Sequence, residues 1–341
     1  MTNFDAILSQ FGVRAHGIEK ISAGHIHQTY KVIGEREFIL QRINDSVFRQ
    51  PEVIATNIET ANSYLKKHYP DYWFVAPLPD SKGNLLVNDE EGHPWRLFPY
   101  IKGSITYNEL RDPEQAYSAA QEFGKLTRYL EGCPPDQFKP TIDRFHDLTW
   151  RYEQFRTTRA IADADRLDTA QHCISLANEF SYLVDYYQKL INQNILKLRI
   201  THNDTKINNV LFDSISEKAL AVIDLDTLMP GYFIYDLGDM VRTFVSPANE
   251  EEKELSKVTF RKEFYDGLLA GYLSQMKPLL SKEELEVVPK AGLLMTYIMA
   301  LRFLTDYLAG DTYYQTYYPG QNLVRAKNQL HLLQLLRQSI P

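Results

Sequence analysis

The spacing of apolar residues in the first hundred positions predicts a sheet that is interrupted by one helix. Short apolar runs at 29–33 and 37–41 are separated by a turn, which favours a hairpin, and a second hairpin is expected across residues 77–87. Between the two hairpins, apolar residues recur at helical spacing, so a helix is expected from Pro51 to about Lys67. Residues 95–103 then predict a strand that runs into a connector containing proline and glycine.

The rest of the chain, from Pro113 onward, has a mainly helical pattern that short apolar strands interrupt around residues 200–226. Its longest apolar run lies between about Leu293 and Leu301 and ends at Arg302. This run is shorter than the roughly 20 residues that a membrane-spanning helix needs, so we expect a buried helix. The two patterns together predict an α+β chain with a smaller sheet-containing part and a larger helical part.

Composition and charge restrict the kind of protein and its partners. With 341 residues, 44% of them apolar, the chain is long enough for two lobes and a substantial core. A net charge of −7 and a pI near 5.8 argue against a general nucleic-acid or anionic-membrane surface. Cys133 and Cys173 lack metal-site spacing, and the N-terminus lacks the features of a signal peptide. We therefore expect a cytoplasmic protein that has neither nucleic acid nor a membrane as partner.

Polar residues between positions 200 and 226 carry the candidate chemistry. Asp204 lies in a polar loop after an apolar pair, Asn209 follows five residues later, and Asp224 ends an apolar strand further on. This order suits phosphoryl transfer from a nucleoside triphosphate, in which the protein chiefly positions groups and neutralises charge. Asp204 would meet the acceptor hydroxyl, while Asn209 and Asp224 offer the hard oxygen ligands that Mg²⁺ prefers. The alternative is a surface loop with solvated side chains, which one Asp–Asn pair alone would favour.

His202, Asp204, Lys206 and Asn209 fall on the fixed positions of the catalytic-loop pattern His-x-Asp-x-Lys-x-x-Asn, and so resemble the protein-kinase-like phosphotransferases. The Asp-Leu-Asp at 224–226 is similar to the small-molecule kinases, which act on aminoglycosides, choline or sugars. The resemblance implies a two-lobed protein-kinase-like fold that uses ATP and Mg²⁺ to phosphorylate an alcohol group of a small-molecule substrate. Asp204 would accept the hydroxyl proton, and Lys206 would offset charge on the moving phosphoryl group.

The same resemblance implies residues that support the loop and the metal. His202 would have a structural role. Asp226 would either bind a second metal ion or support the ligands of the first one without binding the metal itself. Asp236 would brace the catalytic loop by accepting backbone hydrogen bonds. Alternatively, Asp236 caps the N-terminus of a helix from Leu237 to Phe244.

The implied layout has an ATP-binding lobe at residues 1–98, a hinge up to about residue 103, and a catalytic and substrate-binding lobe at residues 104–341. In this layout the hinge offers backbone groups to the adenine edge. Phe98 and Tyr100 are therefore candidates for nucleotide binding by their position, and their side-chain chemistry plays no part in the choice.

Other nucleotide contacts are expected from the strands. The Gly24–His25 loop would lie over the triphosphate with backbone amides facing phosphate oxygens, although a single glycine in a hairpin also serves a plain turn. The third strand should carry a phosphate-holding lysine, but Gln41 and Arg42 stand there. Gln41 aligns best, and Arg42, which alternation points to the other face, is expected to compensate in part. The helix carboxylate that normally pairs with this lysine would be Glu59 or Glu52.

Further segments resemble the N-acetylhexosamine 1-kinases, namely residues 24–30, 39–44, 47–48 with Pro51, 224–231 and 301–313. This resemblance implies ATP-dependent phosphorylation of the anomeric hydroxyl of an N-acetylated hexosamine, with a sugar 1-phosphate as product. The alternatives are a kinase for choline, homoserine, methylthioribose or an aminoglycoside and, from another class, a pseudokinase-like binding module.

Candidate substrate contacts lie on the long apolar helix and in one loop. Arg302 and Asp306 are one helical turn apart and share a face with aromatic residues, so they are candidates for sugar binding. A surface salt bridge between them is the alternative, but an arginine inside an apolar stretch is costly when it is unpaired. Asp143, Arg144 and His146 follow a proline-bounded loop and could approach the cleft or be solvated.

Overall fold

In this computed structural model, which describes residues 2–21 and 27–340, the chain divides into two compact units. Unit 1 comprises the described residues up to 105 together with 132–143 and 211–230, and unit 2 comprises 106–131, 144–210 and the described residues from 231 onward. Unit 1 holds the N-terminal sheet, whereas unit 2 is mainly helical. The α+β class expected from the sequence is therefore confirmed.

Unit 1 is built on an antiparallel sheet whose described strands follow the order β1-β2-β3-β5-β4. The predicted hairpin of residues 29–33 and 37–41 is confirmed, because β2 and β3 pair along their length, and the helix predicted from Pro51 is confirmed as α2. The helices and strands that form this part are α1 (Phe4–Gln10), β1 (Gly17–Ile21), β2 (Gln28–Ile33), β3 (Phe38–Arg42), α2 (Pro51–His68), β4 (Val87–Asn88) and β5 (Pro94–Pro99).

The two faces of this sheet differ in character, because successive side chains of a strand point to opposite sides. One face carries Leu40 and Leu97 in an apolar core that includes helix α1. The strand register places Thr29, Gln41 and Arg96 next to one another across β2, β3 and β5. By alternation this polar row lies on the opposite face.

The second predicted hairpin, across residues 77–87, is wrong. The residues on either side of its turn pair with β5 instead of with each other: Leu78 bridges Leu97, and β4 pairs with β5. The turn between them is closed locally by the Asp80 carboxylate, which accepts two backbone N–H groups at 2.8 Å. A turn signal in the sequence therefore located the turn but not the partners of the flanking strands.

A second sheet of unit 1 brings distant parts of the sequence together in the order β6-β8-β9. Val75, Ile101 and Ala221 are buried in one apolar cluster, with Phe98 and Ile223 packed against them. The end of β5 and the strand that leads to Asp224 thus share an apolar core. The strands are β6 (Ser104–Ile105), β8 (Val210–Asp213) and β9 (Ala219–Val222).

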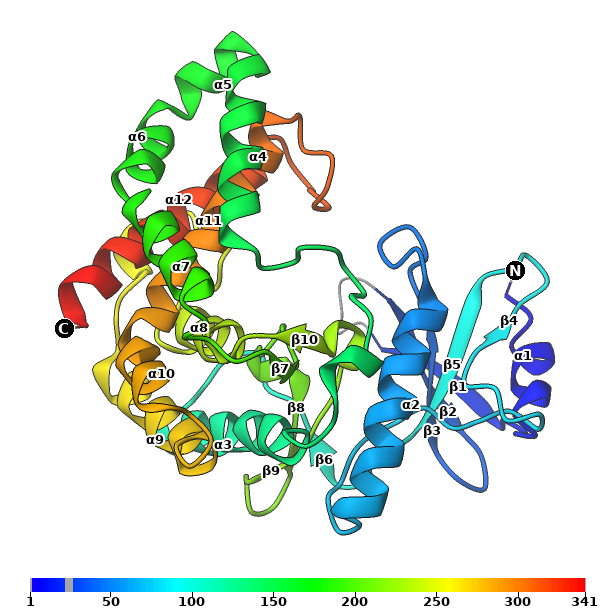
Figure 1. Cartoon of the computed structure of the whole chain (residues 1–341). Coiled ribbons are helices and arrows are strands. Elements are labelled where there is room, and N and C mark those ends of the chain that lie inside the picture. The colour runs from blue at the N-terminus through cyan, green and yellow to red at the C-terminus, as the bar shows by residue number, and fades with distance from the viewer. Residues whose placement is uncertain (1, 22–26, 341) are drawn as a thin grey trace. The chain divides into compact units, whose positions relative to one another are not determined.

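Unit 2 is organised around helix α11, which packs against α4, α8 and α12 (Figure 1). The helical segment that contains it, Lys282–Leu308, spans 27 residues and is long and apolar enough to cross a membrane, but 89% of its apolar window is buried inside the protein. The segment is longer than its apolar run predicts and is the buried helix that was expected.

The elements of unit 2 are α3 (Pro113–Tyr129), α4 (Leu148–Ile161), α5 (Ala164–Thr169), α6 (Gln171–Glu179), α7 (Tyr182–Asn192), β7 (Arg199–Thr201), α8 (Phe233–Phe244), α9 (Lys262–Met276), α10 (Lys282–Val287), α11 (Ala291–Leu308) and α12 (Gln321–Ser339), and β10 (Met229–Gly231) precedes α8.

Candidate active site

The loop between β7 and β8 carries the expected catalytic residues, and helix α8 holds its backbone. The Asp236 carboxylate accepts the backbone N–H of His202 at 3.1 Å and that of Asn203 at 2.7 Å. The Asp236 carbonyl accepts the Thr205 hydroxyl at 2.7 Å. Because α8 begins at Phe233, Asp236 lies inside its first turn, and the alternative role of Asp236 as the helix N-cap is wrong.

This clamp holds a strained backbone and an unusual carboxylate. Asn203 has a φ of 66°, in the left-handed region that residues other than glycine adopt at a cost. Burial of the Asp236 side chain raises its pKa to about 6, although the nearby His202 and the two backbone N–H groups favour the ionised form. Both backbone N–H groups of the loop have an acceptor when Asp236 is ionised.

Asp204, Lys206 and Asn209 lie together on this loop. Lys206 Nζ is 3.2 Å from Asp204 Oδ1, and the two side chains are 38% and 27% exposed. Asn209 Nδ2 donates to the Asp204 carbonyl at 2.9 Å and to Asp204 Oδ2 at 3.2 Å. Burial alone would raise the pKa of Asp204, but the Lys206 ammonium outweighs that effect and lowers it. The loop thus presents an ionised, partly exposed carboxylate, as a proton acceptor requires.

His202 supports this loop from the interior. Its side chain is fully buried, and its ring lies edge-on to Phe123 with 5.3 Å between ring centres. Its Nδ1 accepts the backbone N–H of Asp204 at 3.2 Å. These contacts place His202 behind Asp204 and not on the exposed side of the loop.

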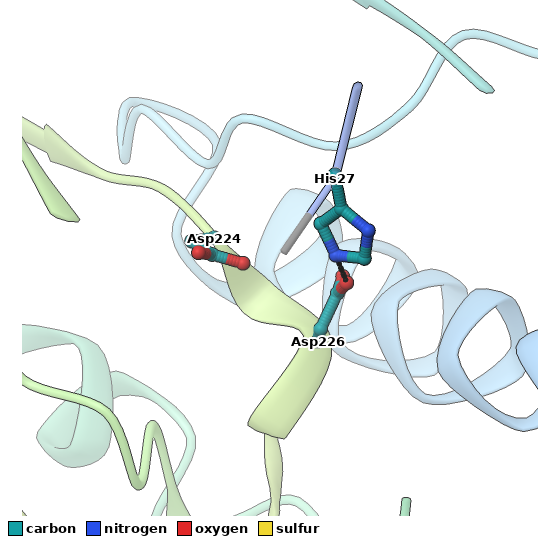
Figure 2. Close-up of side chains that lie close together, drawn as sticks. All are labelled: His27, Asp224 and Asp226. Atoms are coloured by element: carbon teal, nitrogen blue, oxygen red, sulfur yellow. Dashed lines mark hydrogen bonds and ion pairs between the residues drawn. The ribbon is translucent and has the colours of Figure 1, made fainter. Parts of the chain in front are cut away.

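In unit 1, Asp226 lies in a buried ion cluster with His27 and Arg96. Arg96 donates to both carboxylate oxygens, at 2.5 and 2.9 Å, and His27 Nε2 lies 2.6 Å from Oδ2, as the dashed line in Figure 2 marks. His27 Nδ1 accepts the backbone N–H of Asn44 at 3.0 Å, so Nε2 carries the proton and donates to Asp226. Burial would raise the pKa of Asp226, but Arg96 and His27 lower it, and the carboxylate stays ionised.

The same cluster contains the candidate metal ligands. Ligand atoms of His27, Asp224 and Asp226 all lie within 4.8 Å of one another (Figure 2). His27 uses both ring nitrogens in hydrogen bonds, and the charge of Asp226 is balanced by the Arg96 guanidinium, so both are less available to a cation than Asp224 is. Asp224 is the exposed member of the three and has a φ of 59°. A hard cation that takes one carboxylate from this unit fits Asp224, and the geometry favours an indirect role for Asp226.

The cation beside Gln41 is Arg96, which corrects the expectation for Arg42. Arg96 Nε and Nη2 donate to Gln41 Oε1 at 2.9 and 2.6 Å, and Gln41 Nε2 donates to Thr29 Oγ1 at 3.1 Å. Arg42 pairs in register with Trp95 and, by alternation, points to the other face. The signal for Arg96 was present in the sequence as a charged residue within an apolar strand.

Helix α2 contributes an asparagine to this region instead of the expected glutamate. Glu59 is exposed, and its carboxylate accepts hydrogen bonds from Asn62 and Ser63 of the same helix. Asn57 is buried and donates through Nδ2 to the carbonyls of Leu228 at 3.0 Å and Lys139 at 2.8 Å. Asn57 thereby ties α2 to the turn that follows Asp226, and its polar side chain within the apolar stripe of α2 was the sequence signal.

Phe98 and Tyr100, the two candidates from the hinge, have different neighbours. Phe98 packs on the apolar cluster of Val75, Ile101 and Ala221, and the Arg96 guanidinium lies 5.1 Å from its ring centre. Tyr100 lies under the Lys31 ammonium, 4.1 Å from the ring centre.

Gly24 and His25 lie outside the residues that the structure describes.

Arg302 and Asp306 are both buried, and the alternative of a surface salt bridge between them is wrong. The Asp306 carboxylate accepts the backbone N–H groups of Thr312, Tyr313 and Tyr314 at 2.7 to 2.9 Å, so it fixes that loop. Arg302 lies among aromatic rings of the same unit.

His146, a candidate from the proline-bounded loop, contacts the catalytic loop. His146 Nε2 hydrogen-bonds the Asn203 carbonyl at 2.8 Å, so it is not simply solvated.

Comparison with known proteins identifies the family. The model of the phosphotransferase enzyme family matches residues 17–280. An aminoglycoside phosphotransferase from Alicyclobacillus acidocaldarius has a TM-score of 0.65 at 14% identity, over 98% of this chain and 95% of that chain. A microcompartment-associated aminopropanol kinase has a TM-score of 0.61 at 17% identity (98% and 96%), and an amicoumacin kinase in complex with AMP-PNP and Ca²⁺ has 0.63 at 13% (99% and 94%).

These structural likenesses confirm the expected kinase-like fold, and the family match gives the reaction class. The chain belongs to the phosphotransferase enzyme family and is an ATP- and Mg²⁺-dependent kinase that phosphorylates an alcohol group of a small molecule.

Proposed function

We propose that this kinase phosphorylates the anomeric hydroxyl of an N-acetylhexosamine and releases a sugar 1-phosphate. The observation that carries the kinase chemistry is the ionised Asp204 held between Lys206 and Asn209. The choice of acceptor is supported by the resemblance of segments 24–30, 39–44, 224–231 and 301–313 to N-acetylhexosamine 1-kinases. An anomeric hydroxyl is a slightly stronger acid than an ordinary alcohol, which lowers the demand on the base.

The proposed roles follow from the environment of each residue. ATP with Mg²⁺ supplies the phosphoryl group and offsets its charge. Asp204 orients the acceptor hydroxyl and accepts its proton, and Lys206 offsets charge on the moving phosphoryl group. Asp224, the exposed carboxylate of its cluster, and Asn209, whose amide is oriented by its Nδ2 bonds, each offer an oxygen ligand to a metal ion.

An amine-bearing acceptor, such as an aminoglycoside or choline, is the main alternative. A cationic acceptor needs carboxylates to receive it, but the Asp306 carboxylate is occupied by backbone donors. Asn322 Nδ2 donates to both Asp306 and Asp311, so a second carboxylate lies close to it. Because Asp306 is already occupied by its own chain, it does not support an amine-bearing acceptor.

ADP release with a panel of sugars and amines, followed by phosphorus NMR of the product, tests the proposal. We expect N-acetylglucosamine or N-acetylgalactosamine to have a kcat/KM well above that of glucose or galactose. The product should be an acid-labile 1-phosphate whose phosphorus couples to the anomeric proton. A 6-phosphate product, or activity confined to choline or aminoglycosides, would contradict this acceptor and leave the kinase assignment intact.

A further inference from the structure

We infer that His146 is a positioning residue for the phosphoryl transfer, because its hydrogen bond to the Asn203 carbonyl sets the place from which Asp204 extends its carboxylate. This inference rests on the role proposed for Asp204 as proton acceptor and does not depend on which acceptor is phosphorylated. All three residues belong to unit 2. His146 precedes helix α4, whereas Asn203 and Asp204 lie on the loop between β7 and β8.

The peptide group that joins Asn203 to Asp204 is held at both of its polar ends. His146 Nε2 bonds the carbonyl oxygen of Asn203 at 2.8 Å, and the backbone N–H of Asp204 donates to His202 Nδ1 at 3.2 Å. A peptide group is planar, so fixing its two ends fixes the orientation of the whole plane. Because the Cα atom of Asp204 belongs to this plane, the position of its side chain depends on both contacts.

The preceding peptide group is held separately by helix α8, since the Asp236 carboxylate accepts the backbone N–H of Asn203 at 2.7 Å. The two backbone torsion angles of Asn203 are the only soft rotations between the two planes, so Asp236 and His146 together hold both angles. This arrangement explains how Asn203 keeps a φ of 66°, which is costly for a residue other than glycine. Without the contact to His146, the second plane is free to turn and the loop can relax.

The ring of His146 is suited to this one contact. His146 is 4% exposed, and its Nδ1 is buried and makes no hydrogen bond to a described residue. Burial and the charge of Arg302 lower the pKa of His146 well below its usual range, so the ring is neutral and carries one proton. Because the partner of Nε2 is a carbonyl oxygen, that proton is on Nε2 and the ring donates to Asn203.

Helix α4 holds His146 in place through the residues on either side of it. Arg151 of α4 donates through Nε and Nη2 to the Phe145 carbonyl at 3.2 and 2.9 Å. The Asp147 carboxylate caps the first turn of the same helix. The ring of His146 also packs against Tyr235 of α8, with 5.3 Å between ring centres. His146 therefore links the position of α4 to the catalytic loop.

The test measures ADP release from Mg·ATP with N-acetylglucosamine, or with the member of the sugar and amine panel that the wild type phosphorylates fastest. The amide nitrogen of Gln can take the place of Nε2, so His146→Gln should keep a kcat within several-fold of the wild type. His146→Leu has no donor and should lower kcat by ~10–10²-fold, the effect of a misplaced catalytic group, with little change in either KM. His172 is an exposed histidine of α6, and His172→Leu, the matched control, should keep full activity.

A double-mutant cycle with Asp204→Asn separates positioning from a general loss of structure. Since His146 acts through the Asp204 carboxylate, His146→Leu should cause no further loss of kcat in a chain that already carries Asp204→Asn. If His146→Leu does not fold, His146→Asn takes its place, because the shorter amide cannot reach the Asn203 carbonyl.

Three results would overturn the inference and leave the proposed function intact: a normal kcat in the folded variant without the donor, an equal loss in His146→Gln, or an equal loss with and without Asp204→Asn. Near-normal turnover of Asp204→Asn alone would overturn both the inference and the role proposed for Asp204.

Discussion

Asp204 is held by a cation and an amide, and both contacts favour its ionised form. Lys206 Nζ lies 3.2 Å from one carboxylate oxygen, and Asn209 Nδ2 lies 3.2 Å from the other. A base with these neighbours is unprotonated over the whole physiological range, so its reactivity depends on orientation more than on titration.

Asp204→Asn should fold normally, bind Mg·ATP and lose ~10²–10⁴-fold in kcat, the usual contribution of a positioned proton acceptor. The rate of ADP release measures the loss, and calorimetry measures nucleotide binding. Asp266→Asn, an exposed carboxylate on α9, is the control and should keep full activity. Near-normal turnover of Asp204→Asn on the true acceptor would show that Asp204 is not the base.

Arg96 and Asp226 form a buried ion pair, in contrast to the partly exposed Asp204, since each of their side chains is 2% exposed. The pair contributes to the fold only while both partners are present, because a lone buried charge is costly. Arg96→Met should therefore lower the free energy of unfolding by about 3–5 kcal/mol, and adding Asp226→Asn should recover part of that loss. Thermal unfolding monitored by circular dichroism tests both variants. If the double variant is no more stable than Arg96→Met, the two side chains are not coupled.

At the scale of elements, helix α8 fixes the catalytic loop. The Asp236 carboxylate of α8 accepts the backbone N–H of Asn203, whose backbone is left-handed. Asp236 has an ordinary pKa of 3.8 when unfolded and about 6 when folded, because burial disfavours its charge. Protonation turns one of its oxygens into a donor, which cannot accept a backbone N–H. The ionised form of Asp236 is therefore the form that holds the loop.

The expected result is a fall in kcat/KM as pH drops below about 6, while Asp204 stays ionised. Asp236→Asn should lose that acid limb and have a kcat/KM ~10-fold or more below the wild type, since the amide accepts fewer of the two N–H groups. The free energy of unfolding should change with pH in the opposite direction to kcat/KM, because protonated Asp236 stabilises the folded state. The contribution of Asp236 to the free energy of unfolding is fully present below pH 3.8 and is lost as pH rises through 6. An acid limb that persists in Asp236→Asn would assign it to another group.

Features that depend on residues close together in the sequence could be predicted, whereas features that depend on residues far apart could not. The candidate catalytic residues lie within a few positions of one another, so their resemblance to a short kinase motif located them, and α2 was visible from its periodicity. Arg96 was missed because its partner Asp226 is 130 residues away and only the folded chain brings the two together. The false hairpin at 77–87 arose for the same reason, since a turn does not specify with which strand its flanks pair.

Across the whole molecule, most groups expected near the nucleotide belong to unit 1, whereas Asp204, Asn209 and the candidate acceptor contact Arg302 belong to unit 2. Unit 1 contains Asp224, the Arg96 cluster and the apolar cluster beside Phe98. A change at Asp224 should therefore alter the binding of Mg·ATP with little effect on the binding of the acceptor. This separation can be measured with single variants of the full chain.

Asp224→Ala should raise the Mg²⁺ requirement and abolish ADP release, because the exposed carboxylate of its cluster is lost, while the Kd for N-acetylglucosamine changes little. Asn209→Ala should behave likewise toward the metal. Calorimetry with Mg·ATP and with the sugar measures the two affinities separately, and Asp71→Ala, an exposed carboxylate of unit 1, is the control. Intact Mg·ATP binding in Asp224→Ala would remove Asp224 from the metal site. A matching loss of sugar affinity would show instead that nucleotide and acceptor binding are coupled through the fold.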